Sequence, residues 1–418
     1  MFRATLLLFL LFFPSSLLAG GDWCLATAYK LPSEYTNQES GYFSIIEGLN
    51  GKLYVGAAKY GVNGYLLEFD PKTGKTAMVM DVMKTIGSDA TGFAAQAKIH
   101  TRNNVGKSGK IYVASKQGYP ENGESRDAYP GGYVLTYDPA TKKSEHFGIA
   151  KPKQGIISVI PDEDRGVAYV STCSDDRPID HTHFMILDLK KKTYRDLGDM
   201  EHAYAFIVLD DRHRAYHPKR GGTVVRFDPK LDKVEELKIT IDGKEVPKSL
   251  SKPDCIQNWD TTADGKLLYC IEMTTNELFV FDLTSSEKSL SGKSLGQLLP
   301  EVKGTDCRAL CVAPDGKVWM AVKDVNYPGG GLTHLVSYFP GEKGCKDQGP
   351  IGIANPDFTT FTTADGKPKP WHHTIRKEKD GTLTPWITMG IAAGKDGRVF
   401  VVSIAPFTLL EFGPFRKK

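Results

Sequence analysis

The chain has 418 residues, of which 40% are hydrophobic and 25% charged, and it contains 42 glycines and 24 prolines. This composition is typical of a globular protein with a sizeable core and many turns, and the length predicts two or three domains or one large all-β domain. The formal net charge of +3 excludes the strongly basic surface with which proteins bind nucleic acid or anionic membranes.

Residues 1–20 predict a secretory signal peptide. Arg3 precedes an apolar run from Leu6 to Phe13, and the small residues Ala19 and Gly20 follow it as a candidate cleavage point. An uncleaved anchor is the alternative, but the apolar run is too short to span a bilayer comfortably. We therefore expect the mature chain, residues 21–418, to be periplasmic or secreted, with no other contact with a membrane.

The mature chain repeats one β-hairpin seven times. Each copy has strand-forming residues on both sides of a turn that is rich in Gly, Asn or Asp. A third strand follows each copy in a matching register, as in YLLEFD at 65–70 and YVLTYD at 133–138, and a fourth segment follows most copies. The hairpins lie at 44–57, 97–115, 157–172, 204–218, 256–272, 308–322 and 388–403.

Four strands repeated seven times predict an all-β fold, a seven-bladed β-propeller with four antiparallel strands per blade. Unrelated hairpins in a sandwich are the alternative, which the seven matching registers disfavour. The last repeat lacks a fourth strand, so we expect the N-terminal strand, within 22–32, to complete it and close the ring. No domain boundary appears in 21–418, and we interpret 340–385 as an insertion over the mouth of the central channel.

Seven cysteines occur in the chain. An exported protein can form disulfides. Cys255 and Cys270 lie on the two arms of one predicted hairpin, which makes them the first candidate pair.

In a propeller the first strand of each blade lines the channel, and its start and the end of the second strand open on one face. The repeat therefore predicts which residues share this mouth. From starts of first strands come Gln96, Lys98, His202, Tyr204, Asn258, Trp259 and Arg308; from ends of second strands come Lys116, Gln117, Tyr119, Cys173, Asp175, Asp176, Arg177, His217, Arg220, Glu272 and Lys323.

The fourth repeat holds the densest set of chemically active residues. His202 and Tyr204 lie on one side of a strand because strand residues alternate, and His217 and Arg220 end the partner strand. These four are candidate catalytic residues for proton transfer with an anion clamp. The alternative is that they only hydrogen-bond within the channel wall.

Cationic and aromatic residues at the mouth are candidate substrate-binding residues, namely Lys98, Lys116, Tyr119, Trp259, Arg308 and Arg376. A divalent metal ion is a candidate cofactor, with Gln96, His372 and His373 as its ligands. Adjacent histidines of a strand point opposite ways, so both bind one ion only in a bent loop. No serine nucleophile motif, phosphate loop, HExxH or dinucleotide fingerprint occurs in the sequence.

The motif GKIYVASKQG at 109–118, followed by GGYVLTYDPATKK at 131–143, resembles secreted bacterial propeller proteins and the seven-bladed polysaccharide lyases, namely ulvan lyases and oligogalacturonate lyases. This resemblance covers most of the mature chain as a fold. It implies β-elimination at a uronic acid, which needs a carboxylate neutraliser, a base and an acid.

By that resemblance, Arg220 would neutralise the carboxylate, His217 or His202 would be the base, and Tyr204 would donate or accept the proton. In oligogalacturonate lyases the neutraliser is a manganese ion held by His and Gln, and Gln96, His372 and His373 are matching residue types. The chain departs from the ulvan lyase pattern at Gln96-Ala97-Lys98, where a His-Ser/Thr-Lys run is expected.

Three functions remain open from the sequence. The first is an exported, monomeric propeller that cleaves an acidic polysaccharide by elimination. The second is a non-catalytic propeller that binds glycan or protein through the same mouth. The third is a metal-dependent hydrolase similar to the lactonases.

Overall fold

The structure is a computed structural model that describes residues 23–36, 40–121, 123–174, 181–202, 205–245, 257–272, 276–285, 289–355, 375–404 and 407–415. The predicted signal peptide, Tyr204, Cys255, His372 and His373 lie outside these ranges. The helices of the described part are short: α1 (Val82–Ile86), η1 (Ser33–Tyr35), η2 (Gly92–Ala94), η3 (Arg126–Ala128) and η4 (Glu163–Arg165). None of these helices has the length and hydropathy that a membrane-crossing helix needs.

Strands in the first half of the chain follow one another as antiparallel meanders. The first meander is β2 (Ser40–Glu47), β3 (Leu53–Lys59), β4 (Asn63–Asp70) and β5 (Lys75–Asp81); the second is β6 (Lys98–Ile99) and β7 (Asn104–Val105), both paired with β8 (Ile111–Lys116), then β9 (Tyr133–Asp138) and β10 (Lys143–Ile149). The third is β11 (Gly155–Asp162), β12 (Val167–Cys173), β13 (His183–Asp188) and β14 (Thr193–Asp199).

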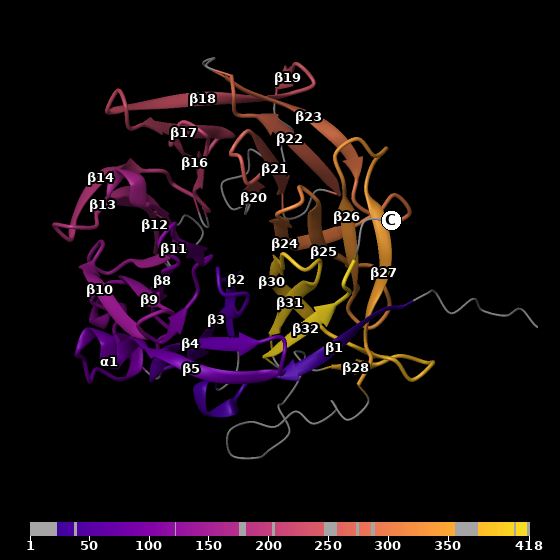
Figure 1. Ribbon diagram of the computed structural model, residues 1–418, viewed down its shortest axis with the longest axis horizontal. Helices are drawn as coiled ribbons and strands as arrows, with labels where there is room; N and C mark the ends of the chain where they lie inside the picture. The colour runs from indigo at the N-terminus through magenta and orange to yellow at the C-terminus, as the bar shows by residue number, and fades with distance from the viewer. Residues whose placement is uncertain are drawn as a thin grey trace, which may run out of the picture.

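The second half continues the same pattern. Its meanders are β15 (Val208–Leu209), β16 (Ala215–Lys219), β17 (Thr223–Asp228) and β18 (Lys233–Ile241); β20 (Gln257–Thr261), β21 (Leu267–Glu272), β22 (Glu277–Asp282) and β23 (Ser289–Gln297); β24 (Thr305–Val312), β25 (Val318–Asp324), β26 (Leu332–Tyr338) and β27 (Lys346–Ile353); and β30 (Ile387–Ala393), β31 (Val399–Ile404) and β32 (Thr408–Phe412). Three short strands lie outside these meanders: β19 (Lys244–Glu245), β28 (Arg376–Lys377) and β29 (Leu383–Thr384). Figure 1 shows the meanders arranged around a centre, with β2, β20, β24 and β30 nearest to it.

Burial explains why some strands of each repeat have apolar sequences and others do not. Inner strands such as β3, β8 and β31 are buried along almost their whole length, because neighbouring sheets cover both of their faces. Outer strands such as β5 and β14 have several exposed residues. The apolar runs and tight turns of the repeats therefore predicted the inner strands best.

The two ends of the chain share one sheet. β1 (Cys24–Lys30) pairs antiparallel with β32 through Thr27–Lys30, and parallel with β27 through Cys24–Ala26. The side chain of Asn355 fixes this joint, because it accepts a hydrogen bond from the backbone N–H of Ala28 at 2.8 Å and donates one to the Ala28 carbonyl at 2.9 Å. The predicted pairing of the N-terminal strand with the last repeat is confirmed.

Two parts of the sequence interpretation need correction. The predicted insertion at 340–385 is not one excursion, since 346–353 form β27, which pairs with β26 and β1. Gly and Pro weaken the strand signal of β27, and its pairing with distant strands overrides that weak local propensity. Cys270 is a buried free thiol rather than half of the predicted disulfide.

Side chains close the centre of the ring. Phe43, Phe206 and Trp259 pack together in one core cluster there, and a cavity of only about 20 Å³ remains between β2, β20, β24 and β30. Arg102 crosses this centre, forming an ion pair with Asp260 at 2.7 Å. The expected channel is therefore filled in its middle.

The joint at β1 gives a stability prediction. Asn355→Ala removes both hydrogen bonds to Ala28 and leaves a buried backbone N–H and carbonyl without these partners, so we expect the free energy of unfolding in urea to fall by about 2 kcal/mol. Asn326→Ala, which changes an exposed turn residue, is the control and should change it by less than about 0.5 kcal/mol. Equal effects of the two substitutions would contradict a role for Asn355 in closing the ring.

Candidate functional site

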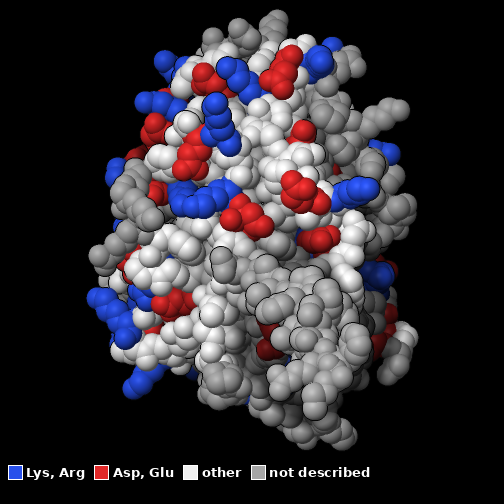
Figure 2. All heavy atoms as spheres, turned by 90° about the vertical axis from the view of Figure 1, so that its right-hand side faces the viewer, with Lys and Arg blue, Asp and Glu red and all other residues white. Residues whose placement is uncertain are grey.

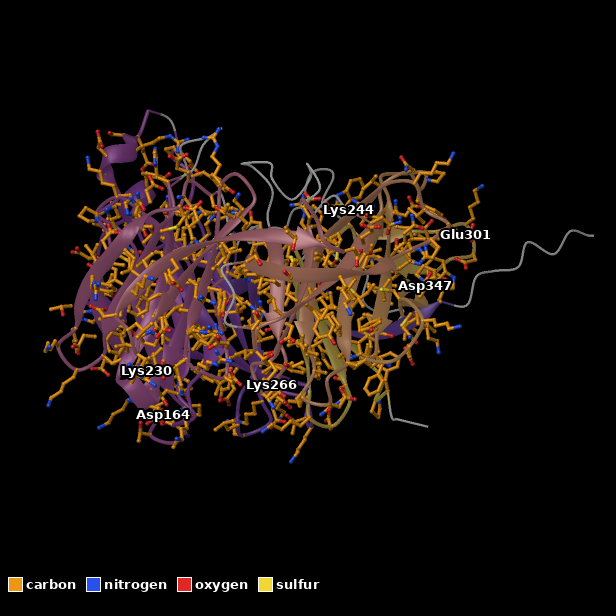
Figure 3. The ribbon with its side chains drawn as sticks, turned by 90° about the horizontal axis from the view of Figure 1, so that it is seen from above. Asp164, Lys230, Lys244, Lys266, Glu301 and Asp347 are labelled. Carbon is orange, nitrogen blue, oxygen red and sulfur yellow. The ribbon has the colours of Figure 1, made fainter. Side chains whose placement is uncertain are left out.

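The predicted mouth lies at one end of the ring. Figure 3 places Asp164 and Lys266 along one edge of the molecule and Lys244 along the opposite edge. Asp164 and Lys266 lie in the turns between first and second strands, so the second strands end on the other side. We use "mouth" for that end, where β3, β8, β16, β21 and β25 finish.

Lys98, a candidate substrate-binding residue, lies among three tyrosine rings. Its Nζ is 5.4 Å from the ring centroid of Tyr42, 5.2 Å from that of Tyr60 and 4.6 Å from that of Tyr119. The hydroxyl of Tyr42 is 3.4 Å from the hydroxyls of both Tyr60 and Tyr119. Lys98 is buried, whereas Tyr119 is 54% exposed. We call these four residues the lysine–tyrosine cluster; it joins a buried amine to an aromatic surface in contact with solvent.

An unusual backbone conformation brings Tyr42 to this cluster. Its φ is 55°, in the left-handed region that costs a residue with a Cβ about 1–2 kcal/mol. The register of β2 against β3 is irregular between Ser40 and Ile45. The Tyr42 ring packs against the imidazole of His100, with the ring centroids 4.3 Å apart and the planes tilted by 54°. Strained backbone of this kind is concentrated at binding and catalytic sites.

Lys116 faces Lys98 across neighbouring strands. The two residues are a directly opposed pair of β8 and β6, so their side chains lie on the same face of the sheet. Both are almost fully buried. Two buried lysines therefore lie side by side in the wall beside Tyr119.

Gln96 does not fit the proposed metal site. Its amide oxygen accepts hydrogen bonds from the Ser115 hydroxyl at 2.6 Å and the Tyr129 hydroxyl at 2.8 Å, and its amide nitrogen donates to the Gly131 carbonyl at 2.9 Å. These bonds occupy the oxygen that would bind an ion. Gln96 instead connects β8 to the loop at 117–131. The other two proposed ligands of the metal ion, His372 and His373, lie outside the described residues.

His217 is buried too deeply to contact a substrate. It is fully buried, and burial is the main cause that lowers its pKa to about 3. Its Nδ1 donates to the Pro218 carbonyl at 2.6 Å, so Nε2 accepts a hydrogen bond from the Ser171 hydroxyl at 2.9 Å. The predicted catalytic base is thus a neutral imidazole that connects β12 to β16.

The other predicted catalytic residues are only partly brought together. His202 is buried and close enough to His217 to contribute to lowering its pKa. Arg220 is partly exposed and pairs with Glu201 at 3.3 Å. The position of Tyr204 lies outside the described residues, so the four-residue set stays a prediction, with His217 placed in the wall.

The buried imidazole predicts a pH dependence of stability. At pH 7.5 His217 is neutral in both the folded and the unfolded state. Below its ordinary pKa of 6.5 the imidazole binds a proton only in the unfolded state. In the folded state it binds the proton only at about pH 3. This linkage lowers the free energy of unfolding by about 1.4 kcal/mol per pH unit in that window. His217→Gln abolishes it, so the wild-type advantage over this variant should shrink by about 2 kcal/mol between pH 7.5 and pH 5.

Urea unfolding at the two pH values measures this difference. Asn326→Ala, which removes no titratable group, is the control and should keep a constant difference from the wild type. A constant difference for His217→Gln as well would show that the imidazole is not held neutral by burial.

Trp259 is a core residue rather than a binding surface. Its indole N–H donates to the Phe206 carbonyl at 2.6 Å, its side chain is buried, and its own carbonyl accepts a hydrogen bond from Arg102. Trp259 lies on the first strand of its repeat, as predicted. Its side chain, however, packs in the core at the centre of the ring.

A second group at the mouth surrounds Lys323, whose pKa both Arg308 and Arg376 affect. Arg308 forms a bidentate ion pair with Asp306, and Arg376 donates to Glu378 at 2.9 Å and lies over the Trp386 ring at 5.9 Å. The ammonium of Lys323, at the end of β25, lies over the same ring at 5.0 Å. We call Arg308, Lys323, Arg376 and Trp386 the basic–aromatic cluster.

Two residues of these clusters, Tyr60 and Lys323, were not predicted to bind substrate, although their places in the repeats indicated the mouth. Tyr60 directly follows the second strand of the first repeat, and Tyr119 comes three residues after the second strand of the second repeat. Lys323 was placed at the mouth by its register. Nothing local marks Tyr42 or Trp386, whose positions depend on contacts with distant strands. Among the described residues, no group of three His, Cys, Asp or Glu side chains could hold a metal ion.

No family model matches the chain, and no curated protein matches its sequence. Solved structures do match. The extracellular domain of the putative one component system BT4673 from B. thetaiotaomicron aligns with a TM-score of 0.56 and 10% identity, covering 94% of this chain. This chain spans 40% of the length of that structure's chain.

Two further structures match over nearly their whole length. The β-propeller domain of Cps50 (Swd1) from Myceliophteria thermophila has a TM-score of 0.55 and 10% identity, with 93% of this chain and 99% of that chain covered. A chain of the Mitotic Checkpoint Complex has a TM-score of 0.52 and 10% identity, with 98% and 99% covered. With the meanders described above, these matches identify the fold as an all-β, β-propeller fold.

Proposed function

We propose that the protein is an exported, monomeric, single-domain β-propeller that binds an acidic oligosaccharide or polysaccharide at its mouth. We assign seven blades of four strands to it, because each predicted repeat coincides with one antiparallel meander and β1 supplies the fourth strand of the last. Export is supported by the sequence of residues 1–20.

The lysine–tyrosine cluster is the observation that carries this proposal. Sugar rings bind to the faces of aromatic side chains, and carboxylate or sulfate groups pair with ammonium and guanidinium groups. Tyr119 presents an aromatic face to solvent directly over the amine of Lys98. The basic–aromatic cluster repeats the same combination of residue types on a different part of the mouth.

Charge on the outer wall does not offer an equivalent site. On the face that Figure 2 shows, Lys and Arg are interspersed with Asp and Glu. Elsewhere on the molecule, surface charges form ion pairs, such as Lys151 with Asp196 and Arg195 with Asp232. The mouth is therefore the better place for an anionic polymer.

Binding can be tested with one exposed ring. Tyr119→Ala removes the aromatic face over Lys98, so we expect the affinity for the acidic polysaccharide that binds best in a panel to fall about tenfold, or about 1.4 kcal/mol. Leu231→Ala is the control, since Leu231 is also exposed, at 66%, and neighbours Lys230 on the edge opposite the mouth. Equal affinities of the two variants, or no binding by the wild type to any acidic polysaccharide, would refute the proposal.

Eliminative cleavage is the second candidate function, and the three tyrosine hydroxyls favour it. They converge beside the Lys98 amine, so the cluster holds groups that can act as base and acid next to a cation. Residues of this cluster would act as base and acid in place of His217, which is buried in the fold. Metal-dependent hydrolysis has no supporting observation among the described residues.

Cleavage would produce an unsaturated uronate that absorbs in the ultraviolet. If the cluster is catalytic, Tyr42→Phe should lower the rate of absorbance increase about 100-fold or more, because the variant keeps the ring but loses the central hydroxyl. Arg220→Gln should leave that rate within a few-fold. The opposite order of the two variants would place catalysis in the fourth repeat.

A further inference from the structure

Lys323 is the one member of the basic–aromatic cluster whose charge the described residues do not neutralise by contact. Arg308 has Asp306 as its bidentate partner, and Arg376 has Glu378. The Lys323 ammonium makes no hydrogen bond or ion pair with any described residue, and it is half-buried over Trp386. Asp306 is directly opposite Lys323 in the pairing of β24 with β25, but its carboxylate is bound by Arg308. A ligand oxyanion would give the half-buried ammonium of Lys323 a counter-ion in direct contact.

Two polar atoms, one beside this cluster and one within it, have no hydrogen-bond partner in the described part of the chain. The hydroxyl of Thr333 is buried, and Thr333 is directly opposite Lys323 in the pairing of β26 with β25, so both side chains lie on one face. The Nε–H of Arg376 is the second such atom. Hydroxyl and guanidinium N–H groups donate to oxyanions, as an ammonium does.

The backbone packs closely against these side chains. Gly330 and Gly331 have φ of 103° and 95°, which favour glycine. A Cβ at Gly330 would lie 2.4 Å from the Trp386 ring, and one at Gly331 would lie 2.3 Å from Lys323 Cε. The glycine loop thus holds the indole and the lysine stem in fixed positions, which limits the entropy that a ligand must overcome.

We propose that Lys323, Arg308 and Arg376 form an anion subsite that receives one carboxylate or sulfate group of the saccharide, with Lys323 as its primary contact. The saccharide as source of that group rests on the proposed function, whereas the oxyanion chemistry rests on the cluster alone. Burial is the main cause that lowers the pKa of Lys323; Asp306 raises it, and Arg376 and Arg308 lower it. The three cations of this group have two carboxylate partners, Asp306 and Glu378, so one positive charge is left over.

A matched lysine exists at the other end of the same strand. Lys317 precedes β25, and its Nζ lies over the Trp319 ring at 4.5 Å. Burial lowers its pKa too, the carboxylates of Glu342 and Asp315 raise it, and Lys346 lowers it. Lys317 therefore reproduces the stacking on an indole without the surplus of positive charge.

Amine acetylation of the wild-type protein, read by peptide mass spectrometry, tests the subsite at single-residue resolution. Sodium glucuronate and sodium sulfate are the two ligands, with sodium chloride at equal ionic strength and glucose as blanks. We expect either or both oxyanions to lower acetylation of Lys323 at least threefold and to leave Lys317 unchanged. Protection by glucuronate alone assigns a carboxylate, and protection by sulfate alone assigns a sulfate ester. Protection by neither, or equal protection of Lys317, would overturn the proposal.

A variant extends the test to the polymer. Lys323→Met keeps the stem packed on Trp386 but removes the charge, so affinity for the bound acidic polysaccharide should fall about tenfold, whereas Lys317→Met should leave it unchanged. Polysaccharide binding without protection of Lys323 would refute the anion subsite and still support the proposed function. Protection of Lys323 without polysaccharide binding would do the reverse.

Discussion

The pairing of β1 with β32 is the constraint on which the structure depends. Each sheet of the ring buries its faces against two neighbours, so a ring open at one joint would expose two apolar faces. The chain closes that joint with its own ends, and Asn355 ties the backbone of Ala28 into it through two hydrogen bonds. Folding of the last sheet therefore requires residues that are almost 400 positions apart.

Closure also decides where chemistry can occur. The centre is filled by Phe43, Phe206 and Trp259 and crossed by the Arg102–Asp260 ion pair. The lysine–tyrosine and basic–aromatic clusters lie at the ends of β8 and β25. The register of the repeats placed Lys98, Tyr119 and Lys323 at this end from the sequence alone.

The sequence predicted the strands well because their signal is local. Tight turns between apolar runs determine each hairpin, and the short last repeat required a strand from elsewhere. β27 was missed since Gly349 and Pro350 obscure its pattern, while pairing with β26 and β1 stabilises it.

Side-chain roles were harder to predict because they depend on non-local contacts. Gln96 and His217 have the residue types of a ligand and a base, but hydrogen bonds to Tyr129 and Ser171 make them part of the wall. Conversely, Tyr42 reaches Lys98 only through its left-handed backbone. A residue type at a given register therefore indicates an end of the ring, and the partners across the sheets decide its role.

The cavity of about 20 Å³ at the centre has a consequence for any polymeric ligand. Under the function that we propose, a polymer would lie sideways on the rim, because the described side chains fill the centre. It would be bound along an internal stretch, so recognition would not require a free chain end. Long and short polymers would present the same local segment, and affinity would depend on the spacing of charges along it rather than on its termini.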